Sequence, residues 1–329
     1  MELSSKALII SAQNYSRYPK LQGPDSDAYD FQQWLLNFDP ACQVTTVGAQ
    51  GSPEGRPTGD EIKLALGSWL DEKPYPNGQP IADRAYIYYS GHGIAPNPDD
   101  AQIVSANATP KVLLGASGRA ILNYLEKGGY FREIVLIMDC CRDTTSSDAI
   151  SLDLPIFNDP LALGTKRFIA FATSFPLKSK EYAIPPGNQV RGLFTAALLE
   201  GLKGKAAPDI AGKITGKSLN DYVQNRLPDL LKDCGVDFTQ PPRFEPADSD
   251  MDFGTAPPPT QSLLISTRPD QVGNSIRILI GQNQVFAQTT AGPSLWSVPA
   301  PPGVYIVIDD MTSETKSAFL KGVDYNVDF

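Results

Sequence analysis

The chain has 329 residues, of which 41% are hydrophobic and 20% charged, as in ordinary globular proteins long enough for two domains. Its formal net charge of −9, with no Lys/Arg cluster to offset it, argues against a nucleic-acid partner. No apolar run approaches the roughly 20 residues of a membrane span, and the N-terminus lacks the form of a signal peptide, so we expect a cytoplasmic protein with no membrane partner.

Strand and helix patterns alternate through the N-terminal part of the chain. Residues 6–11 (KALIIS) form an apolar run and residues 42–47 (CQVTTV) alternate, so both are predicted as strands. Between them, Ser26 is expected to cap a helix with Asp27 in its first turn. After a loop rich in Gly and Pro, Asp60 opens a second helix.

Two further apolar runs end in residues that carry chemistry. Residues 85–93 (AYIYYSGHG) contain His92, the only histidine of the chain, and residues 132–143 (REIVLIMDCCRD) contain Cys140 and Cys141. Apolar runs without alternation are typical of strands buried on both faces of a parallel sheet. The carboxyl ends of such strands lie at one edge, where open α/β sheets bind ligands. We therefore expect the imidazole and a thiol to meet at this edge.

The connections around these strands also have recognisable patterns. A helix is predicted over residues 117–127, after a polar loop at 94–109. The segment 144–165 is a long loop without a basic residue, and loops of about 20 residues in a compact domain are usually functional or mobile. Residues 167–172 are predicted as a strand, followed by a loop at 173–189.

Two helices complete the predicted N-terminal domain. One covers residues 192–202, and the other starts at Ser218 and is broken near Pro228. Alternating strands and helices over residues 1–245 predict an α/β domain, with a mainly parallel sheet flanked by helices on both faces.

The composition changes after this domain. Residues 246–260 are rich in Pro and acid and are predicted as a linker. Residues 261–329 contain short apolar runs separated by turn residues, which predict a small all-β domain, a sandwich. Its segment PAPPGVYIVI resembles a strand of small immunoglobulin-like domains.

A thiol attacks a carbonyl as its thiolate and needs a group that takes its proton, which imidazole can do near neutral pH. Gly91 and Gly93, which flank His92, leave room for a peptide backbone to approach. The backbone amides of Gly93 and Cys141 are expected to form an oxyanion hole. A thiol at the end of a buried strand is more often a core residue, so these residues alone leave catalysis and a structural role about equally open.

YYSGHG and IMDCCRD, about 50 residues apart, resemble the two active-site motifs of caspase-like cysteine peptidases, the superfamily of caspases, metacaspases and bacterial caspase homologues. The resemblance covers residues 5–245, because LIISAQNY, LQGPDSDA, RFIAFATS and GLFTAALLEGL are similar to flanking elements of that family. It implies a caspase-like fold, with His92 as general acid/base. It also implies Cys141 as nucleophile, because Asp139 and Cys141 satisfy the family's Asp-x-Cys pattern, and Cys140 then faces the core. The sequence shows no third member, so a dyad is predicted.

The resemblance also implies a specificity. In metacaspase-like enzymes the acids corresponding to Asp27 and Asp139 line a pocket for Arg or Lys, and Ser90 is expected nearby. Two carboxylates can hold a guanidinium by charge-assisted bonds, although Asp27 can equally be a favourable charge in the first turn of a helix. Arg142 is expected to face away from the substrate, in a surface ion pair with Asp143. We therefore predict an endopeptidase that cleaves proteins after Arg, with Lys second.

No cofactor and no required metal are predicted. The four cysteines lack metal-ligand spacing and are expected to be thiols. Asp148 and Asp153 are candidate calcium ligands, but they do not form an Asp-x-Asp-x-Asp pattern. The expected partners are a protein substrate with a basic cleavage site and an activating or inhibiting protein. Resemblance to bacterial homologues implies a pathway of regulated cell death or antiviral defence.

Two other classes of function fit the same sequence. The chain could be a catalytically silent caspase-fold scaffold or adaptor, although the presence of both His92 and Cys141 weighs against this. It could also be a thiol amidase that acts on a small molecule. A wide, acid-lined cleft would favour the peptidase, and a closed apolar pocket at Cys141 would favour the amidase.

Overall fold

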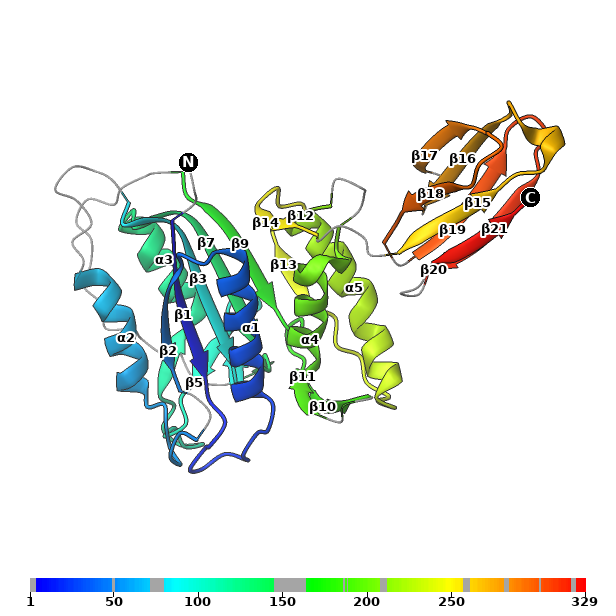
Figure 1. Ribbon diagram of the computed structural model, residues 1–329. Helices are drawn as coiled ribbons and strands as arrows, with labels where there is room; N and C mark the ends of the chain where they lie inside the picture. The colour runs from blue at the N-terminus through cyan, green and yellow to red at the C-terminus, as the bar shows by residue number, and fades with distance from the viewer. Residues whose placement is uncertain are drawn as a thin grey trace. The chain divides into compact units, whose positions relative to one another are not determined.

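The computed structural model (Figure 1) describes residues 4–48, 51–71, 80–144, 164–185, 187, 189–207, 212–256, 261–280, 284–301, 303–320 and 324–329. The chain divides into two compact units. The first comprises residues 1–206 and 215–254, and the second comprises residues 207–214 and 255–329.

The first unit is built on a six-stranded sheet with the order β13-β9-β7-β3-β1-β2. All of its strands run parallel except β13 at the edge, which confirms the predicted mainly parallel sheet. The strands are β1 (Ser5–Ser11), β2 (Gln43–Val47), β3 (Ala82–Ser90), β7 (Phe131–Asp139), β9 (Lys166–Phe171) and β13 (Arg243–Glu245). The central strands β1, β3 and β7 are buried along nearly their whole length, which is why their sequences are almost continuously apolar.

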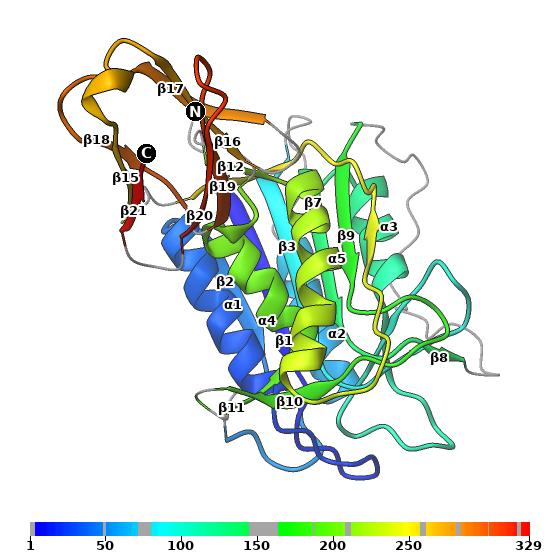
Figure 2. The same ribbon diagram turned by 90° about the vertical axis from the view of Figure 1, so that its right-hand side faces the viewer.

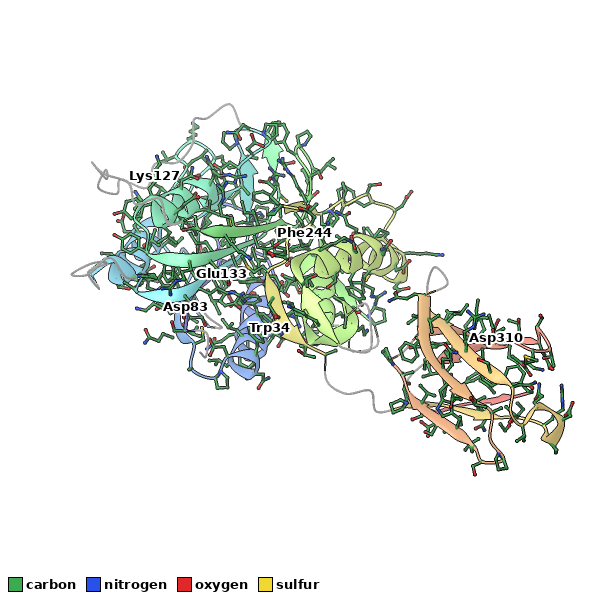
Figure 3. All side chains as sticks on the ribbon, turned by 90° about the horizontal axis from the view of Figure 1, so that it is seen from above. Trp34, Asp83, Lys127, Glu133, Phe244 and Asp310 are labelled. Carbon is green, nitrogen blue, oxygen red and sulfur yellow. The ribbon has the colours of Figure 1, made fainter. Side chains whose placement is uncertain are left out.

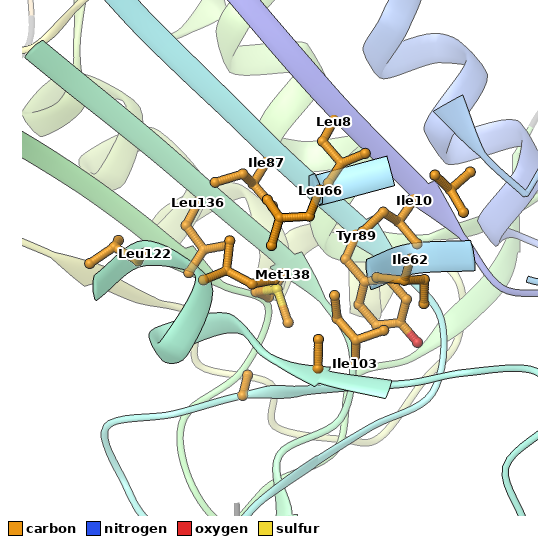
Figure 4. Packing of buried hydrophobic residues seen from close by; sticks show 14 of the residues in the cluster. Leu8, Ile10, Ile62, Leu66, Ile87, Tyr89, Ile103, Leu122, Leu136 and Met138 are labelled. Carbon is orange, nitrogen blue, oxygen red and sulfur yellow. The ribbon is translucent and has the colours of Figure 1, made fainter. Parts of the chain in front are cut away.

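Helices cover both faces of this sheet (Figure 2). On one side lie α1 (Pro24–Phe38), α4 (Leu193–Glu200) and α5 (Gly216–Asp233), and on the other lie α2 (Gly59–Asp71) and α3 (Gly118–Lys127). Figure 4 shows how Ile62 and Leu66 of α2 and Leu122 of α3 pack against the side chains of the sheet. None of the described helices is long and apolar enough to cross a membrane.

The start of α1 differs from the prediction. The helix begins at Pro24 rather than after Ser26, because the fixed φ of proline suits the first helical position. Asp27 still lies in the first turn, but its side chain is fully buried rather than solvated.

The helix α5 is not broken at Pro228, so that prediction was wrong. Thr215 caps the helix and forms a capping box with Ser218. Pro228 lies inside the helix, between the buried Leu227 and Leu230. Burial of this apolar face offsets the backbone hydrogen bond that proline removes.

Both loops predicted beside the two motifs contain short strands. The segment after His92 holds β4 (Gly93–Ala95) and β5 (Gln102–Val104), which form a small sheet with β6 (Gly115–Ser117) and β8 (Asp143–Thr144). The segment predicted as a loop at 173–189 leads into an antiparallel hairpin of β10 (Glu181–Ile184) and β11 (Gln189–Gly192). Strands of two to four residues are too short to show periodicity in the sequence.

Part of the predicted linker belongs to the first unit instead. Residues 246–254 pack within it. Met251 and Phe253 are buried, so a few apolar residues among the prolines and acids anchor this segment. Residues 257–260 lie outside the described part of the chain.

The second unit is a small β-sandwich with one apolar core. One sheet has the order β18-β15-β21 and the other the order β17-β16-β19-β20. The strands are β15 (Ser262–Ser266), β16 (Ser275–Ile280), β17 (Gln284–Thr290), β18 (Trp296–Pro299), β19 (Gly303–Asp309), β20 (Thr315–Leu320) and β21 (Tyr325–Asp328). Asp310, labelled in Figure 3, accepts hydrogen bonds from Nε and Nη2 of Arg277 at 2.7 and 2.6 Å.

Candidate active site

Two adjacent parallel strands bring the predicted catalytic residues together. Ser90 at the end of β3 is in register with Asp139 at the end of β7, so His92 and Cys141 both follow two residues later. Asp83 and Glu133, labelled in Figure 3, lie at the opposite, N-terminal ends of the same strands. At the carboxyl edge, His92 and Cys141 line one cavity of about 500 Å³.

The two adjacent cysteines have different environments. Cys140 is only 2% exposed and belongs to the apolar core, whereas Cys141 is partly exposed in the cavity. The Cys141 thiol donates a hydrogen bond to the carbonyl of Ser179, with a sulfur–oxygen distance of 3.6 Å. Burial raises the pKa of the Cys141 thiol, so that it is protonated at neutral pH.

The imidazole of His92 is held by a backbone group. Its Nε2 lies 2.8 Å from the carbonyl oxygen of Pro19, and its ring packs edge-on against Tyr15 with the ring centres 4.5 Å apart. Because a carbonyl can only accept, Nε2 carries the proton and Nδ1 is left as the basic nitrogen. Burial lowers the pKa of His92, which keeps this base neutral. The sequence predicted a dyad of His92 and Cys141, and the Pro19 carbonyl is a further group that contacts the imidazole.

Two tyrosines hold the backbone of the same histidine. The amide of His92 donates to the hydroxyl of Tyr15 at 2.7 Å, and the hydroxyl of Tyr89 donates to its carbonyl at 2.5 Å. A Cβ at Gly91 would lie 2.4 Å from the Tyr89 hydroxyl and 2.7 Å from that of Tyr15. Glycine is therefore required before His92, because the tyrosines occupy the space of a side chain.

Gly93 brings the two motifs into contact. A Cβ at this position would lie 2.4 Å from the Cys140 sulfur and 2.7 Å from the Cys141 carbonyl oxygen. Gly93 and Cys141, whose amides are the predicted oxyanion donors, both line the cavity.

Asp139, the predicted specificity residue of β7, is buried and accepts three hydrogen bonds. Its Oδ1 accepts from the Ser179 hydroxyl at 2.8 Å, and its Oδ2 accepts from the Thr195 amide and hydroxyl at 3.1 and 2.8 Å. Burial raises the pKa of Asp139, while these three donors favour the charged form and oppose that shift.

Asp27 lies beside Asp139, and its neighbours include the predicted Ser90. Its Oδ2 accepts from the Gly192 amide at 2.9 Å and from the Ser90 hydroxyl at 3.4 Å. Its Oδ1 accepts from Nε of Arg191 at 2.7 Å. Burial, with a smaller contribution from Asp139, raises the pKa of Asp27 to about 7. A favourable charge in the first turn of a helix does not need to be buried beside a second acid. That interpretation therefore does not account for the full burial of Asp27 beside Asp139.

The two carboxylates converge on Gly192. A Cβ there would lie 2.3 Å from Oδ2 of Asp139 and 2.8 Å from Oδ2 of Asp27. Both acids line the cavity together with Ser90, Asp143 and Glu181. The cavity that contains the thiol therefore has four carboxylates in its lining, beside Lys178 and Lys180.

The prediction of a surface ion pair between Arg142 and Asp143 was wrong. Arg142 is fully buried, and its guanidinium donates to backbone carbonyls of Pro98, Asp100 and Thr173. It also lies over the Phe171 ring, 4.2 Å from its centre, and burial lowers the pKa of Arg142 to about 10. Asp143 instead pairs with Lys178 at 3.4 Å.

Arg142→Ala is expected to lower the free energy of unfolding by about 3 kcal/mol or more, because it leaves buried carbonyls without donors and a cavity against Phe171. Urea denaturation at constant pH measures this change. The matched control is Lys166→Ala, which removes a surface ion pair with Asp250 and is expected to change stability by no more than about 0.5 kcal/mol. Equal effects of the two substitutions would contradict a structural role for Arg142.

The candidate calcium ligands Asp148 and Asp153, and most of the long loop at 144–165, lie outside the described residues. Within the described part of the chain, no three His, Cys, Asp or Glu side chains form a group that could hold a metal ion. All four cysteines are free thiols.

Three comparisons with known proteins bear on this site. The family model of the caspase domain matches residues 4–246. A protein from a Desulfuromonadales bacterium described as a probable protease is 29% identical over 216 residues, which are 60% of this chain but 26% of that protein. The chain thus spans about a quarter of that relative's length. The crystal structure of caspase-1 from Spodoptera frugiperda aligns with a TM-score of 0.45 and 15% identity, covering 77% of this chain and 90% of that one.

Proposed function

The chain belongs to the caspase-domain family of cysteine peptidases, and we propose that it is an endopeptidase that cleaves proteins after Arg, and second after Lys. Cys141 is the nucleophile and His92 the general base in this proposal. The observation that carries it is that the thiol, the imidazole and the carboxylates of Asp27 and Asp139 line a single cavity.

We propose the following sequence of proton transfers. Nδ1 of His92 takes the proton of the Cys141 thiol, and the thiolate forms a bond with the carbonyl carbon of the substrate. The imidazolium then gives its proton to the leaving amine as the peptide bond breaks. Water hydrolyses the resulting thioester, with His92 again acting as base. The Pro19 carbonyl supports each step, because it holds Nε2–H and stabilises the imidazolium.

The negative charge that develops on the substrate oxygen needs donors. We propose the backbone amides of Gly93 and Cys141 for this role, because both residues line the cavity beside the thiol. The close approach of Gly93 to the Cys140–Cys141 segment brings the two backbone segments that carry these amides together.

The carboxylates of Asp27 and Asp139 favour a substrate with a basic side chain before the scissile bond. Oδ1 of Asp139 accepts one bond, from Ser179, and a carboxylate oxygen can accept two, so this atom can also accept from a guanidinium. Arginine is preferred over lysine in this proposal because its planar fork can donate to two carboxylates at once, whereas an ammonium is a single point charge.

The acid-rich lining favours a peptidase over a thiol amidase with an apolar pocket. The scaffold alternative is disfavoured because both His92 and Cys141 face the same cavity. From family resemblance alone, we also propose a role in regulated cell death or antiviral defence.

The test is a panel of fluorogenic peptides with Arg, Lys, Asp or Leu before the scissile bond. We expect kcat/KM to be highest for Arg, and Asp139→Asn to lower it about tenfold or more for Arg and Lys, since one charged hydrogen bond is lost. The Leu peptide is expected to be unaffected. Asp143→Asn is the control, because Asp143 lines the cavity but pairs with Lys178.

A preference for Asp or Leu peptides would contradict the acidic specificity pocket. Absence of cleavage of any peptide, in protein shown to be folded, would favour the scaffold. An equal loss in Asp139→Asn for all four peptides would indicate that Asp139 supports the fold of the site rather than its specificity.

A further inference from the structure

The buried carboxylate of Asp27 has a counter-ion from within the chain. Arg191 of β11 donates from Nε to Oδ1 of Asp27 at 2.7 Å and from Nη1 to Asp30 at 2.5 Å. The Arg191 side chain is 12% exposed, and that of Asp27 1%. Arg191 follows a loop far from both motifs, and the sequence pattern did not indicate it.

The hairpin that carries Arg191 is fixed to the start of α1 by further polar contacts. The Glu181 carboxylate of β10 accepts from the backbone amides of Gln22 and Gly23 at 3.1 and 2.8 Å. Gln189 of β11 donates to the Ser26 hydroxyl at 3.1 Å. Arg191 is thus held beside Asp27 independently of the ion pair, so its position does not depend on the charge of Asp27.

The net charge of the group formed by Asp27, Asp139 and Arg191 follows from the protonation state of Asp27. Two ionised acids, Asp27 and Asp139, with one internal cation, Arg191, leave one net negative charge. Without Arg191, burial and repulsion by Asp139 would favour protonation of Asp27, and the net charge would again be one negative. The two cases differ in how many charged acceptors a ligand meets, which is two with Arg191 and one without it.

We propose that Arg191 is a specificity-determining residue that acts through Asp27, by holding it as a carboxylate so that the pocket offers two charged acceptors to the guanidinium of a substrate arginine. This inference rests on the proposed function of the cavity. Arg191 itself does not touch the substrate in this proposal, because the described lining of the cavity includes Asp27 but not Arg191, whose Nε contacts Oδ1 of Asp27.

Several groups face Asp27 and bear on its titration. Asp139 comes from β7, Tyr88 from β3, Arg191 from β11, and Asp30 from α1 itself, where it shares Arg191. Burial raises the pKa of Tyr88 far above neutral, so Tyr88 stays uncharged. Asp27 is the group expected to titrate near pH 7.

The test measures binding of agmatine, an aliphatic guanidinium, to the full chain carrying Cys141→Ala, by calorimetry between pH 5.5 and 8.5. Affinity is expected to rise with pH through about 7, as Asp27 ionises. Arg191→Met in this background is expected to bind about tenfold more weakly at pH 8, with its pH midpoint moved upward, since a charged hydrogen bond is lost. At pH 5.5 the two proteins should bind alike, because Asp27 is protonated in both.

Two further variants separate charge from structure. Gln189→Ala removes another hairpin contact and is expected to keep the wild-type pH profile. Arg191→Lys retains the cation and is also expected to keep this profile, and it serves as the test if Arg191→Met does not fold. Loss of the profile in Arg191→Lys would overturn the proposal.

Equal or tighter binding of agmatine to Arg191→Met at pH 8 would also overturn it, because Asp27 would then be ionised without Arg191. Absence of agmatine binding to the protein that carries only Cys141→Ala would overturn the proposal too. The two proposals fail in different ways. If the protein is not a peptidase, it cleaves no peptide, but pH-dependent binding of agmatine still persists.

Discussion

Replacing Cys141 with Ala is expected to lower kcat/KM by about 10⁴-fold or more, because the proposed thioester cannot form without its sulfur. The other thiol of the lining, Cys140, is only 2% exposed. Replacing Cys140 with Ala is expected to change kcat/KM by less than about threefold. Its thiol lies in the apolar core, where the substitution removes one buried atom and no chemistry.

The measurement is the initial rate of cleavage of an Arg peptide by the two variants and the wild type, with melting temperatures to show that all are folded. Alkylation by iodoacetamide, mapped by mass spectrometry, gives a second readout. Cys141 should be modified in the native protein and Cys140 protected, because it is only 2% exposed. Loss of activity in Cys140→Ala alone would reverse the assignment of the nucleophile.

His92→Ala is expected to lower kcat/KM by about 10²- to 10⁴-fold, which is the usual contribution of a positioned general base. The thiol cannot ionise unaided at neutral pH, because burial raises the pKa of Cys141. Added imidazole should restore part of the rate, since removal of the side chain leaves a space between Tyr15 and the Pro19 carbonyl.

The pH profile of the wild type provides a check on the same residue. His92 must be neutral to act as base, and burial lowers its pKa below 6.5, so activity is expected to rise with pH through a midpoint below 6.5. A Leu peptide should be used, because cleavage after Arg also depends on the ionisation of Asp27 near pH 7. A midpoint near 8 or above would indicate that ionisation of the thiol, not of the imidazole, limits the reaction.

The two pKa shifts together imply a particular resting state. Burial lowers the pKa of His92 and raises that of Cys141, so both favour a neutral thiol and a neutral imidazole. In the proposed mechanism, the proton then moves from the thiol to the imidazole only when substrate is bound. A peptidase with this resting state reacts slowly with alkylating reagents at neutral pH, compared with one that holds a thiolate–imidazolium pair.

The placement of His92 and Cys141 in one cavity follows from local sequence. Each comes after a run of apolar residues, and such runs form the buried central strands of a parallel sheet, whose carboxyl ends meet at one edge. For the same reason the five parallel strands of the main sheet and the flanking helices could be predicted, whereas the antiparallel edge strand β13 was not. The short strands β4, β5, β10 and β11 could not, because their length is below that at which periodicity appears.

The sequence by itself therefore determined the sheet, the order of its elements and the two residues that its edge presents. The tertiary structure alone decided the environment of those residues. The carbonyl of Pro19 beside His92 is a backbone group, which has no signature in the sequence. Arg191 and Asp27 lie 164 residues apart, and Arg142 is buried because three backbone carbonyls point at it. Charged side chains are placed by the partners that packing provides, and adjacency in the chain does not indicate those partners.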